Sequence, residues 1–117
     1  MYPSTMQLDQ FHCHVYFTDQ EQEAARQLLA RIESKFGFAP GKFHLGPVGP
    51  HIGGSCQVKF GLAEFGGFVT WLMGNRDGLT CFIHGLTGDD YVDHTDYVLW
   101  LGKEWDLNLR IFESSTA

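Results

Sequence analysis

One run near the start of the chain constrains the fold more than any other segment. Residues 11–17 read Phe-His-Cys-His-Val-Tyr-Phe, so apolar side chains occupy the odd positions and polar ones the even positions. Side chains two residues apart point to the same side of a β-strand. The run therefore predicts a strand over residues 10–17 with a buried odd face and with His12, His14 and Tyr16 on the other face. Histidine is the commonest metal ligand and the usual acid or base near neutral pH, so this second face is a candidate site.

Length and composition bound the possible functions. The 117 residues suit one domain, so we expect a single domain over residues 1–117. A net charge of −6 disfavours nucleic acids and anionic membrane surfaces as partners. The sequence has neither a long apolar run nor a basic segment followed by an apolar one near residue 1, so we expect a cytoplasmic protein.

Periodicity along the next segments predicts an alternation of helices and strands. A capping-box pattern begins at Thr18, and apolar residues then recur at helical spacing up to Gly37, which predicts a helix over 18–36. A second helical stripe predicts a helix over 62–73. Alternating apolar residues predict three further strands, over residues 42–45, 56–60 and 79–84.

This order most simply forms a ferredoxin-like α+β sandwich of βαββαβ topology. Both helices then cover one face of a four-stranded antiparallel sheet, and the crossover rule predicts the strand order fourth, first, third, second. The remainder of the chain is additional to the sandwich. We predict a C-terminal helix over 94–101, with Asp93 as its N-cap, and a further strand over 105–111 that lies at a sheet edge or is exchanged with a second copy.

The predicted topology gathers further histidines around the first strand. The fourth strand is adjacent and antiparallel to the first, so His84 is expected to neighbour His12. His44 shares their face by strand period, and His51 and His94 lie in segments long enough to reach it. A single histidine on such a face is usually solvated or buried in a dimer, whereas four on one face favour a metal or acid–base site. Iron, zinc, copper and nickel are the metals that suit imidazole.

Other side chains have structural explanations beside functional ones. The three cysteines fall on apolar strand faces, so we expect core residues rather than a disulfide or thiolate ligands: Cys13, Cys56 and Cys81. Arg76 lies in a predicted turn, where arginine is usually solvated but where it can also bind a substrate carboxylate. The aspartates between residues 89 and 96 offer carboxylate ligands or a base, although helix capping explains Asp93.

Several motifs together resemble the DOPA 4,5-dioxygenase family of small single-domain proteins. The resemblance spans about residues 10–110. Its most specific parts are Gly-Pro-Val-Gly-Pro-His, which ends at His51, and Asp-His-Thr at residues 93–95. The chain departs from the usual family pattern at Ile52 and Gly85, where proline is usual, and both changes are expected to loosen the backbone beside a histidine. The other matching segments are residues 11–17, the Asn-Arg-Asp-Gly-Leu run at 75–79 leading to His84, Leu-Thr-Gly-Asp-Asp at 86–90 and Trp-Leu-Gly at 100–102.

The resemblance implies a non-haem iron extradiol dioxygenase that opens the ring of a catechol, such as DOPA or a catecholic acid, with O₂. It implies Fe(II), or another divalent metal that imidazole binds, as the cofactor. Its candidate ligands are four histidines, of which any three can bind: His12, His14, His51 and His84. We assign the metal to His12, His51 and His84, the catalytic roles to His94 and His14, and substrate binding to Arg76, Tyr16 and His44. An all-histidine site is expected because no carboxylate is evident on this face.

Two interpretations from other classes remain open. One is a metal-free, dimeric ferredoxin-like binding or interaction protein whose exposed sheet face closes a dimer, and a homodimer is also expected for the dioxygenase. The other is an isomerase or hydrolase that uses the same imidazoles without O₂. Metal content separates the first from a dioxygenase, and product analysis under nitrogen separates the second.

Overall fold

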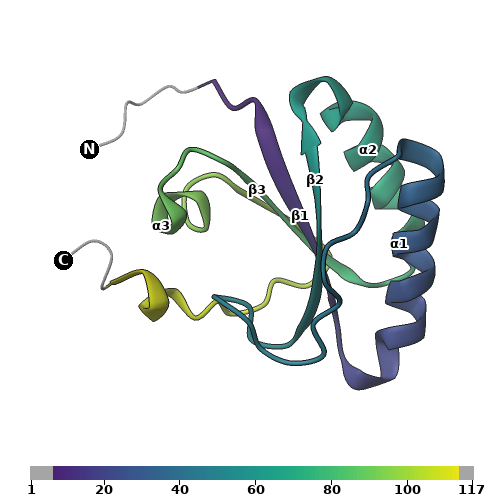
Figure 1. Ribbon diagram of the computed structural model, residues 1–117, viewed down its shortest axis with the longest axis horizontal. Helices are drawn as coiled ribbons and strands as arrows, with labels where there is room; N and C mark the ends of the chain where they lie inside the picture. The colour runs from purple at the N-terminus through teal and green to yellow at the C-terminus, as the bar shows by residue number, and fades with distance from the viewer. Residues whose placement is uncertain (1–6, 114–117) are drawn as a thin grey trace.

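The alternating run at residues 11–17 forms a strand in the computed structural model, which describes residues 7–113. Figure 1 shows a sheet with the two long helices on one side and a short helix and the C-terminal segment on the other. The elements follow one another as β1 (Gln10–Phe17), η1 (Asp19–Glu21), α1 (Gln22–Phe36), β2 (Gly54–Gly61), α2 (Leu62–Asn75), β3 (Thr80–Gly85), α3 (Asp90–Asp93), β4 (Val98–Leu101) and η2 (Leu109–Phe112).

The sheet has four strands in the order β2-β1-β3-β4, and every pairing is antiparallel. The predicted third and fourth strands therefore flank the first, as the crossover rule requires. The α+β, ferredoxin-like fold class is confirmed. Among residues 7–113, no helix combines the length and the apolar character that crossing a membrane would require.

The first helix follows β1 directly, as its sequence signals predict. The Glu21 carboxylate accepts a hydrogen bond from the Thr18 backbone N–H, which satisfies one of the free donors at the helix start. At the other end, Gly37 adopts φ +78°, a left-handed conformation that glycine takes without a Cβ clash, and its N–H closes the last turn on the Glu33 carbonyl.

The odd face of β1 and the two helices build the hydrophobic core. α1 buries the stripe that its spacing predicts, namely Ala25, Leu28, Leu29 and Ile32. α2 buries Phe68, Val69 and Leu72, whereas Leu62, which the predicted stripe included, is 45% exposed. The three cysteines are buried in the same core and are unpaired, which confirms their predicted role as small apolar residues.

The segment at 42–45 does not form a strand of the sheet, but it does lie at the predicted edge. His44 makes a single antiparallel bridge to Ser55, with backbone hydrogen bonds of 2.9 and 3.0 Å in the two directions. Its neighbour Phe43 stacks on Phe17 at 4.3 Å between ring centroids, on the core side. The predicted facing of the two residues is therefore correct, although two prolines and several glycines after them end the pairing after one bridge.

The end of the chain differs from the prediction. Residues 98–101 form β4 at the β3 edge of the sheet, and helix α3 occupies only Asp90–Asp93, so the predicted helix over 94–101 is wrong. The apolar run before Gly102 satisfies both a strand and a helical stripe, and pairing with β3 decides between them. Asp89, not Asp93, caps α3, through a hydrogen bond from the Val92 N–H to the Asp89 carboxylate.

The predicted strand over 105–111 is also wrong, because this segment crosses the even face of the sheet instead of joining an edge. Leu107 makes a single bridge to His51, and Trp105 packs on Tyr16 at 4.7 Å between ring centroids. Phe112, in η2, packs on His94 at 5.1 Å. The chain therefore covers its own polar face with irregular structure.

Candidate functional site

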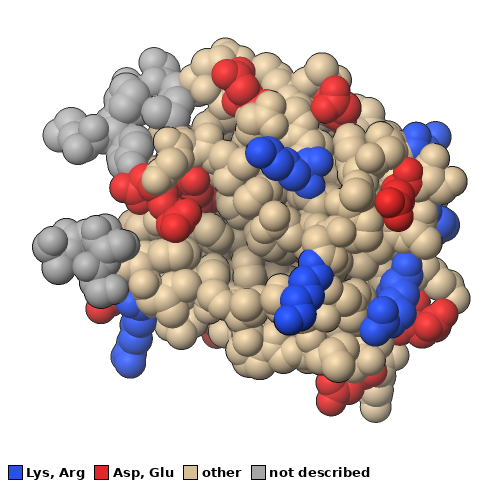
Figure 2. Space-filling view, in the orientation of Figure 1, with Lys and Arg blue, Asp and Glu red and all other residues tan. Residues whose placement is uncertain are grey.

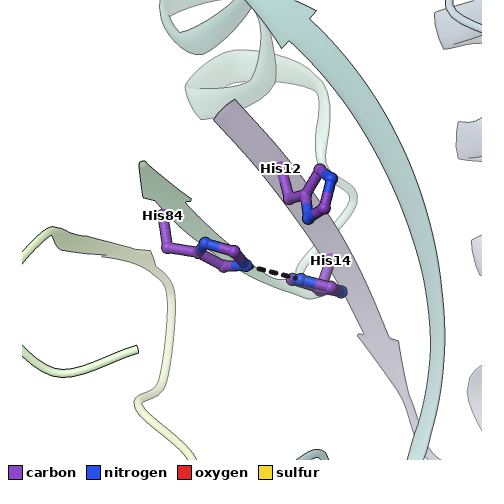
Figure 3. A group of neighbouring side chains, drawn as sticks. All are labelled: His12, His14 and His84. Atoms are coloured by element: carbon purple, nitrogen blue, oxygen red, sulfur yellow. Dashed lines mark hydrogen bonds between the residues drawn. The ribbon is translucent and has the colours of Figure 1, made fainter. Parts of the chain in front are cut away.

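Three histidines converge on the even face of the sheet because of strand register. His12 and His14 lie on β1, and β3 places His84 directly opposite His12, as predicted. The His12 and His84 rings lie 5.2 Å apart between centroids, and the His14 and His84 rings lie 5.1 Å apart. Figure 3 shows the three imidazoles pointing into one common space from the two neighbouring strands.

The side chain of His84 is held in one orientation. Its Nδ1 lies 3.0 Å from the Gly85 carbonyl oxygen, which can only accept, so Nδ1 carries the proton and Nε2 has a free lone pair. The His84 Nε2 lies 3.0 Å from the His14 Nε2 (Figure 3), so His14 donates its Nε2 proton to this lone pair. A metal ion that binds both nitrogens must displace this proton.

A second group of histidines shares His14 with the first. The coordinating nitrogens of His14, His51 and His94 all lie within 4.8 Å of one another, and so do those of His12, His14 and His84. His51 comes from the Pro/Gly loop and His94 from the residue after α3. The His94 Nδ1 lies 2.6 Å from the Asp90 carbonyl oxygen, so its Nε2 also keeps a free lone pair.

Tyr16 fixes the state of His51. The Tyr16 hydroxyl lies 2.6 Å from the His51 Nδ1, and burial raises the pKa of this phenol above its ordinary value of 10. A phenol that stays protonated donates to Nδ1, and His51 then carries its proton on Nε2. His51 is therefore arranged to donate a hydrogen bond through its Nε2, in contrast to His84 and His94.

Burial keeps most of these imidazoles neutral. Loss of hydration, together with the neighbouring histidines, lowers the pKa of His84 to about 3 and that of His51 to about 4. The same desolvation lowers the pKa of His12 and, more strongly, that of His14. A neutral imidazole is the form that binds metals, so the donor set suits a metal ion at neutral pH.

Neither histidine group includes a carboxylate or a thiolate. The buried Asp93 carboxylate is engaged instead by Thr87, whose backbone N–H and hydroxyl both donate to it. This carboxylate orders the loop before α3 and so helps to place His94. An all-imidazole set of neutral nitrogens suits a metal ion that prefers imidazole ligands.

The structure brings some predicted site residues together and separates others. His12 and His84 group with His14, whereas His51 groups with His14 and His94. His44 lies beside His51 as a lining residue of the same pocket. Arg76 lies elsewhere, at the C-cap of α2, where its Nη1 donates to the Leu79 carbonyl oxygen at 2.7 Å.

The sequence did not predict which side chains cover the histidines on the even face of the sheet. Phe82 is fully buried between His14 and Trp100, with ring centroids 6.0 and 4.3 Å away, respectively. Trp105 lies over Tyr16, and no periodicity in its segment indicates this position. Since these side chains cover the imidazoles from within one chain, the polar face is a largely enclosed site.

The two departures from the family pattern have different structural settings. The Gly85 N–H donates to the Tyr97 carbonyl oxygen at 2.9 Å, and a proline at this position would lose that bond next to β4. Gly85 therefore adds a hydrogen bond beside His84. Ile52 is 47% exposed, so its side chain points away from the imidazoles, which are mostly buried.

Comparison with known proteins assigns the chain to a family. The model of the Dopa 4,5-dioxygenase family matches residues 11–111. Relatives include a DOPA 4,5-dioxygenase of Amanita muscaria, 28% identical over 88% of this chain and 49% of its own length, and an uncharacterized 21.2 kDa protein of Botryotinia fuckeliana, 31% identical over 86% and 62%. The chain thus spans about half to three fifths of these curated relatives. A crystal structure from Nostoc punctiforme, provisionally described as a dioxygenase, superposes with a TM-score of 0.89 at 35% identity and covers 99% of this chain and 100% of its own.

Proposed function

Since the chain belongs to the Dopa 4,5-dioxygenase family, we propose that it is a non-haem iron dioxygenase that opens the ring of a catechol with O₂. The observation that carries the proposal is the meeting of five imidazoles on one enclosed sheet face. The overall reaction breaks one ring carbon–carbon bond and adds both atoms of O₂ to the product. It needs no further reductant, because the catechol supplies the electrons that O₂ takes up.

His12, His14 and His84 are the proposed metal ligands. All three project from adjacent strands, and the Gly85 carbonyl fixes the His84 ring, which is the kind of second partner that orients metal-binding histidines. This set replaces His51 of the sequence-based assignment with His14. The grouping of coordinating nitrogens supports the exchange, because those of His12, His14 and His84 lie within 4.8 Å of one another, whereas His51 groups with His14 and His94. Ferrous iron held there would supply the redox chemistry that lets O₂ react with a catechol.

His94 is the proposed acid–base residue. The Asp90 carbonyl holds its Nδ1 proton, so its Nε2 can take a proton from a catechol hydroxyl. Its ring lies 4.2 Å from that of His84 between centroids, which places it against the proposed ligands. His51 completes the pair as a hydrogen-bond donor through its Nε2, and the Tyr16 hydroxyl holds the ring in this state through Nδ1. Phe82 and Trp105 keep water away from these transfers.

The decisive experiment is reconstitution with Fe(II) under nitrogen, followed by O₂ uptake with a panel of catechols. We expect one O₂ consumed per catechol and a yellow ring-opened product. His84→Ala is expected to lose iron binding and activity together, while His94→Gln is expected to keep the iron and lose turnover, because only the first residue is a proposed ligand.

The matched control is Arg76→Met. Arg76 hydrogen-bonds the Leu79 carbonyl and belongs to neither histidine group, so this variant is expected to keep its iron binding and its activity. Iron retention in His84→Ala equal to that of the wild type would contradict the ligand set. Failure of every catechol in the panel to consume O₂ would contradict the reaction.

A further inference from the structure

A polar pocket opens beside the histidines, between the loop that carries His51 and the edge of β2. Its volume is about 290 Å³, and its lining includes His14, His51, Lys42, His44, Ser55 and Gln57. Ligand pockets for small molecules begin at about 300 Å³, so this pocket suits one substituted aromatic ring and no more. None of the residues that line it is acidic.

Backbone pairing brings the polar side chains of this pocket together. Gln57 is opposite His14 in the β1–β2 register, and Ser55 is opposite Tyr16. The bridge between His44 and Ser55 then adds His44 to the same face, and Lys42, two residues before it, shares that side of the extended segment. The Gly41 N–H donates to the Gln57 carbonyl at 2.8 Å and fixes the start of this segment.

Charge is distributed unequally across the histidine face. Lys42 and Lys59 lie on the β2 side, and Lys59 is opposite His12 in the β1–β2 register. On the other side, α3 and its flanks carry four aspartates: Asp89, Asp90, Asp93 and Asp96. Figure 2 shows a group of acidic side chains over α3 and basic side chains near the middle of the view, where β1 and β2 run, with other charges of both signs around the rim. In a chain with a net charge of −6, a pocket lined with a lysine and without carboxylates is selective for anions.

From this arrangement we infer that Lys42, with His44 and Gln57, forms a subsite for a negatively charged substituent, and that the chain takes catechols with a carboxylate side chain in preference to neutral or amine-bearing ones. This inference rests on the proposed function for the identity of the aromatic ring. With the ring at His14 and His51, a short side chain extends toward β2, where Lys42 offers its ammonium group and Gln57 its amide N–H groups. Lys42 and Gln57 are therefore specificity-determining residues rather than catalytic ones.

Calorimetric titration of the iron-loaded protein under nitrogen tests the subsite without turnover. The probes are dihydroxyphenylacetate, a methyl-substituted catechol and dopamine, which are anionic, neutral and cationic versions of one ring. We expect Kd to be about tenfold lower for the acid than for the methyl compound, the size of one charge-assisted hydrogen bond, and dopamine to bind more weakly than either. The preference should shrink at high salt, because screening weakens an exposed charge pair.

Substitutions of single lysines test whether Lys42 is the source of the preference for the acid. Lys42→Met should raise the Kd of the acid about tenfold and leave that of the methyl compound unchanged, and Lys42→Arg should restore the preference. Lys42 is exposed, so these changes leave the fold intact. The matched controls are Lys35→Met, on α1, and Lys59→Met, on the same face but outside the pocket, which remove the same charge and should keep the preference.

Equal affinity for the acid and the methyl compound, or a preference lost in Lys59→Met but kept in Lys42→Met, would overturn the subsite. The outcome is separable from that of the proposed function. Charge-selective binding without ring opening on admission of O₂ contradicts the dioxygenase and supports the subsite, whereas ring opening without charge selectivity does the reverse.

Discussion

The two faces of the sheet differ in what covers them, although the same strand supplies both. The odd residues of β1 lie under α1 and α2, in a core of aliphatic, aromatic and cysteine side chains. The even residues lie under a Pro/Gly loop and a C-terminal segment that are mostly irregular. One face is closed by regular helices whose stripes match it. The other is closed by segments that bury histidines and leave a pocket.

The helix-covered face contributes most of the folding stability, whereas the histidine face carries the candidate site. The helix-covered face contains side chains that gain by leaving water, each worth about 1.5–3 kcal/mol when fully buried. The histidine face instead buries polar groups, whose loss of hydration is costly unless hydrogen bonds replace it. Gly85, Asp90 and Tyr16 provide such bonds to His84, His94 and His51, respectively. The cost of burying these polar groups is offset by the stability of the hydrophobic core, as is common at functional sites.

The largest expected effect is the loss of metal from the histidine face. His84→Ala removes one proposed ligand and the acceptor of His14, so bound iron and activity should fall by at least about a hundredfold. Metal analysis after gel filtration measures the first, and O₂ uptake the second. His44→Ala, outside both histidine groups, should keep its iron. A His84→Ala protein with full iron content would show that the two faces do not differ in this way.

The next effect concerns the apolar face alone. Phe68 is fully buried on α2, and Phe68→Ala should lower the free energy of unfolding by about 3–5 kcal/mol through lost burial and a cavity. Urea denaturation measures this change. Met73, on the same helix, is 63% exposed, so Met73→Ala should change stability by less than about 0.5 kcal/mol. Similar losses in the two variants would mean that α2 does not pack as described.

A third effect is a pH dependence that only the histidine face should produce. The pKa of His84 falls to about 3 and that of His51 to about 4 in the folded protein, against an ordinary value of 6.5 in the unfolded chain. Below about pH 6.5 the unfolded state therefore binds more protons, and stability falls as the pH is lowered. Between pH 7 and pH 5 each of these two histidines should account for about 1–2 kcal/mol.

Urea denaturation of metal-free protein at several pH values checks this dependence. His84→Gln should make the free energy of unfolding depend less steeply on pH, because one histidine with a lowered pKa is gone. Lys35→Met, at an exposed position in the last turn of α1, should leave this dependence unchanged. A stability that rises on acidification from pH 7 to pH 5 would contradict the burial of neutral imidazoles.

The smallest expected effect comes from removing the hydrogen bond between Tyr16 and His51. Tyr16→Phe keeps the buried ring but removes the partner of the His51 Nδ1, so the protein should lose about 1–3 kcal/mol of stability. Turnover should fall more than iron content, because His51 is a proposed hydrogen-bond donor to the substrate and not a ligand. Equal losses of iron and turnover in Tyr16→Phe would instead indicate that His51 binds the metal.

Local pattern accounts for much of this architecture. The period of two in β1 determines which residues are buried, and the helical stripe and Gly37 determine α1. With the crossover rule, these patterns also give the order of the three central strands, and hence the neighbouring positions of His12 and His84. These features follow from steric and solvation preferences of single segments, which do not depend on distant residues.

The sequence by itself therefore determined the three central strands, the two long helices and the meeting of His12, His14 and His84. Only the tertiary structure decided that residues 98–101 pair as β4, that residues 102–112 cross the polar face, and that His51 meets Tyr16. The reason is physical: an apolar run such as residues 98–101 satisfies a strand or a helix equally, and an irregular loop has no period to reveal its path. Long-range pairing and burial select one arrangement, and with it the enclosed pocket beside the imidazoles.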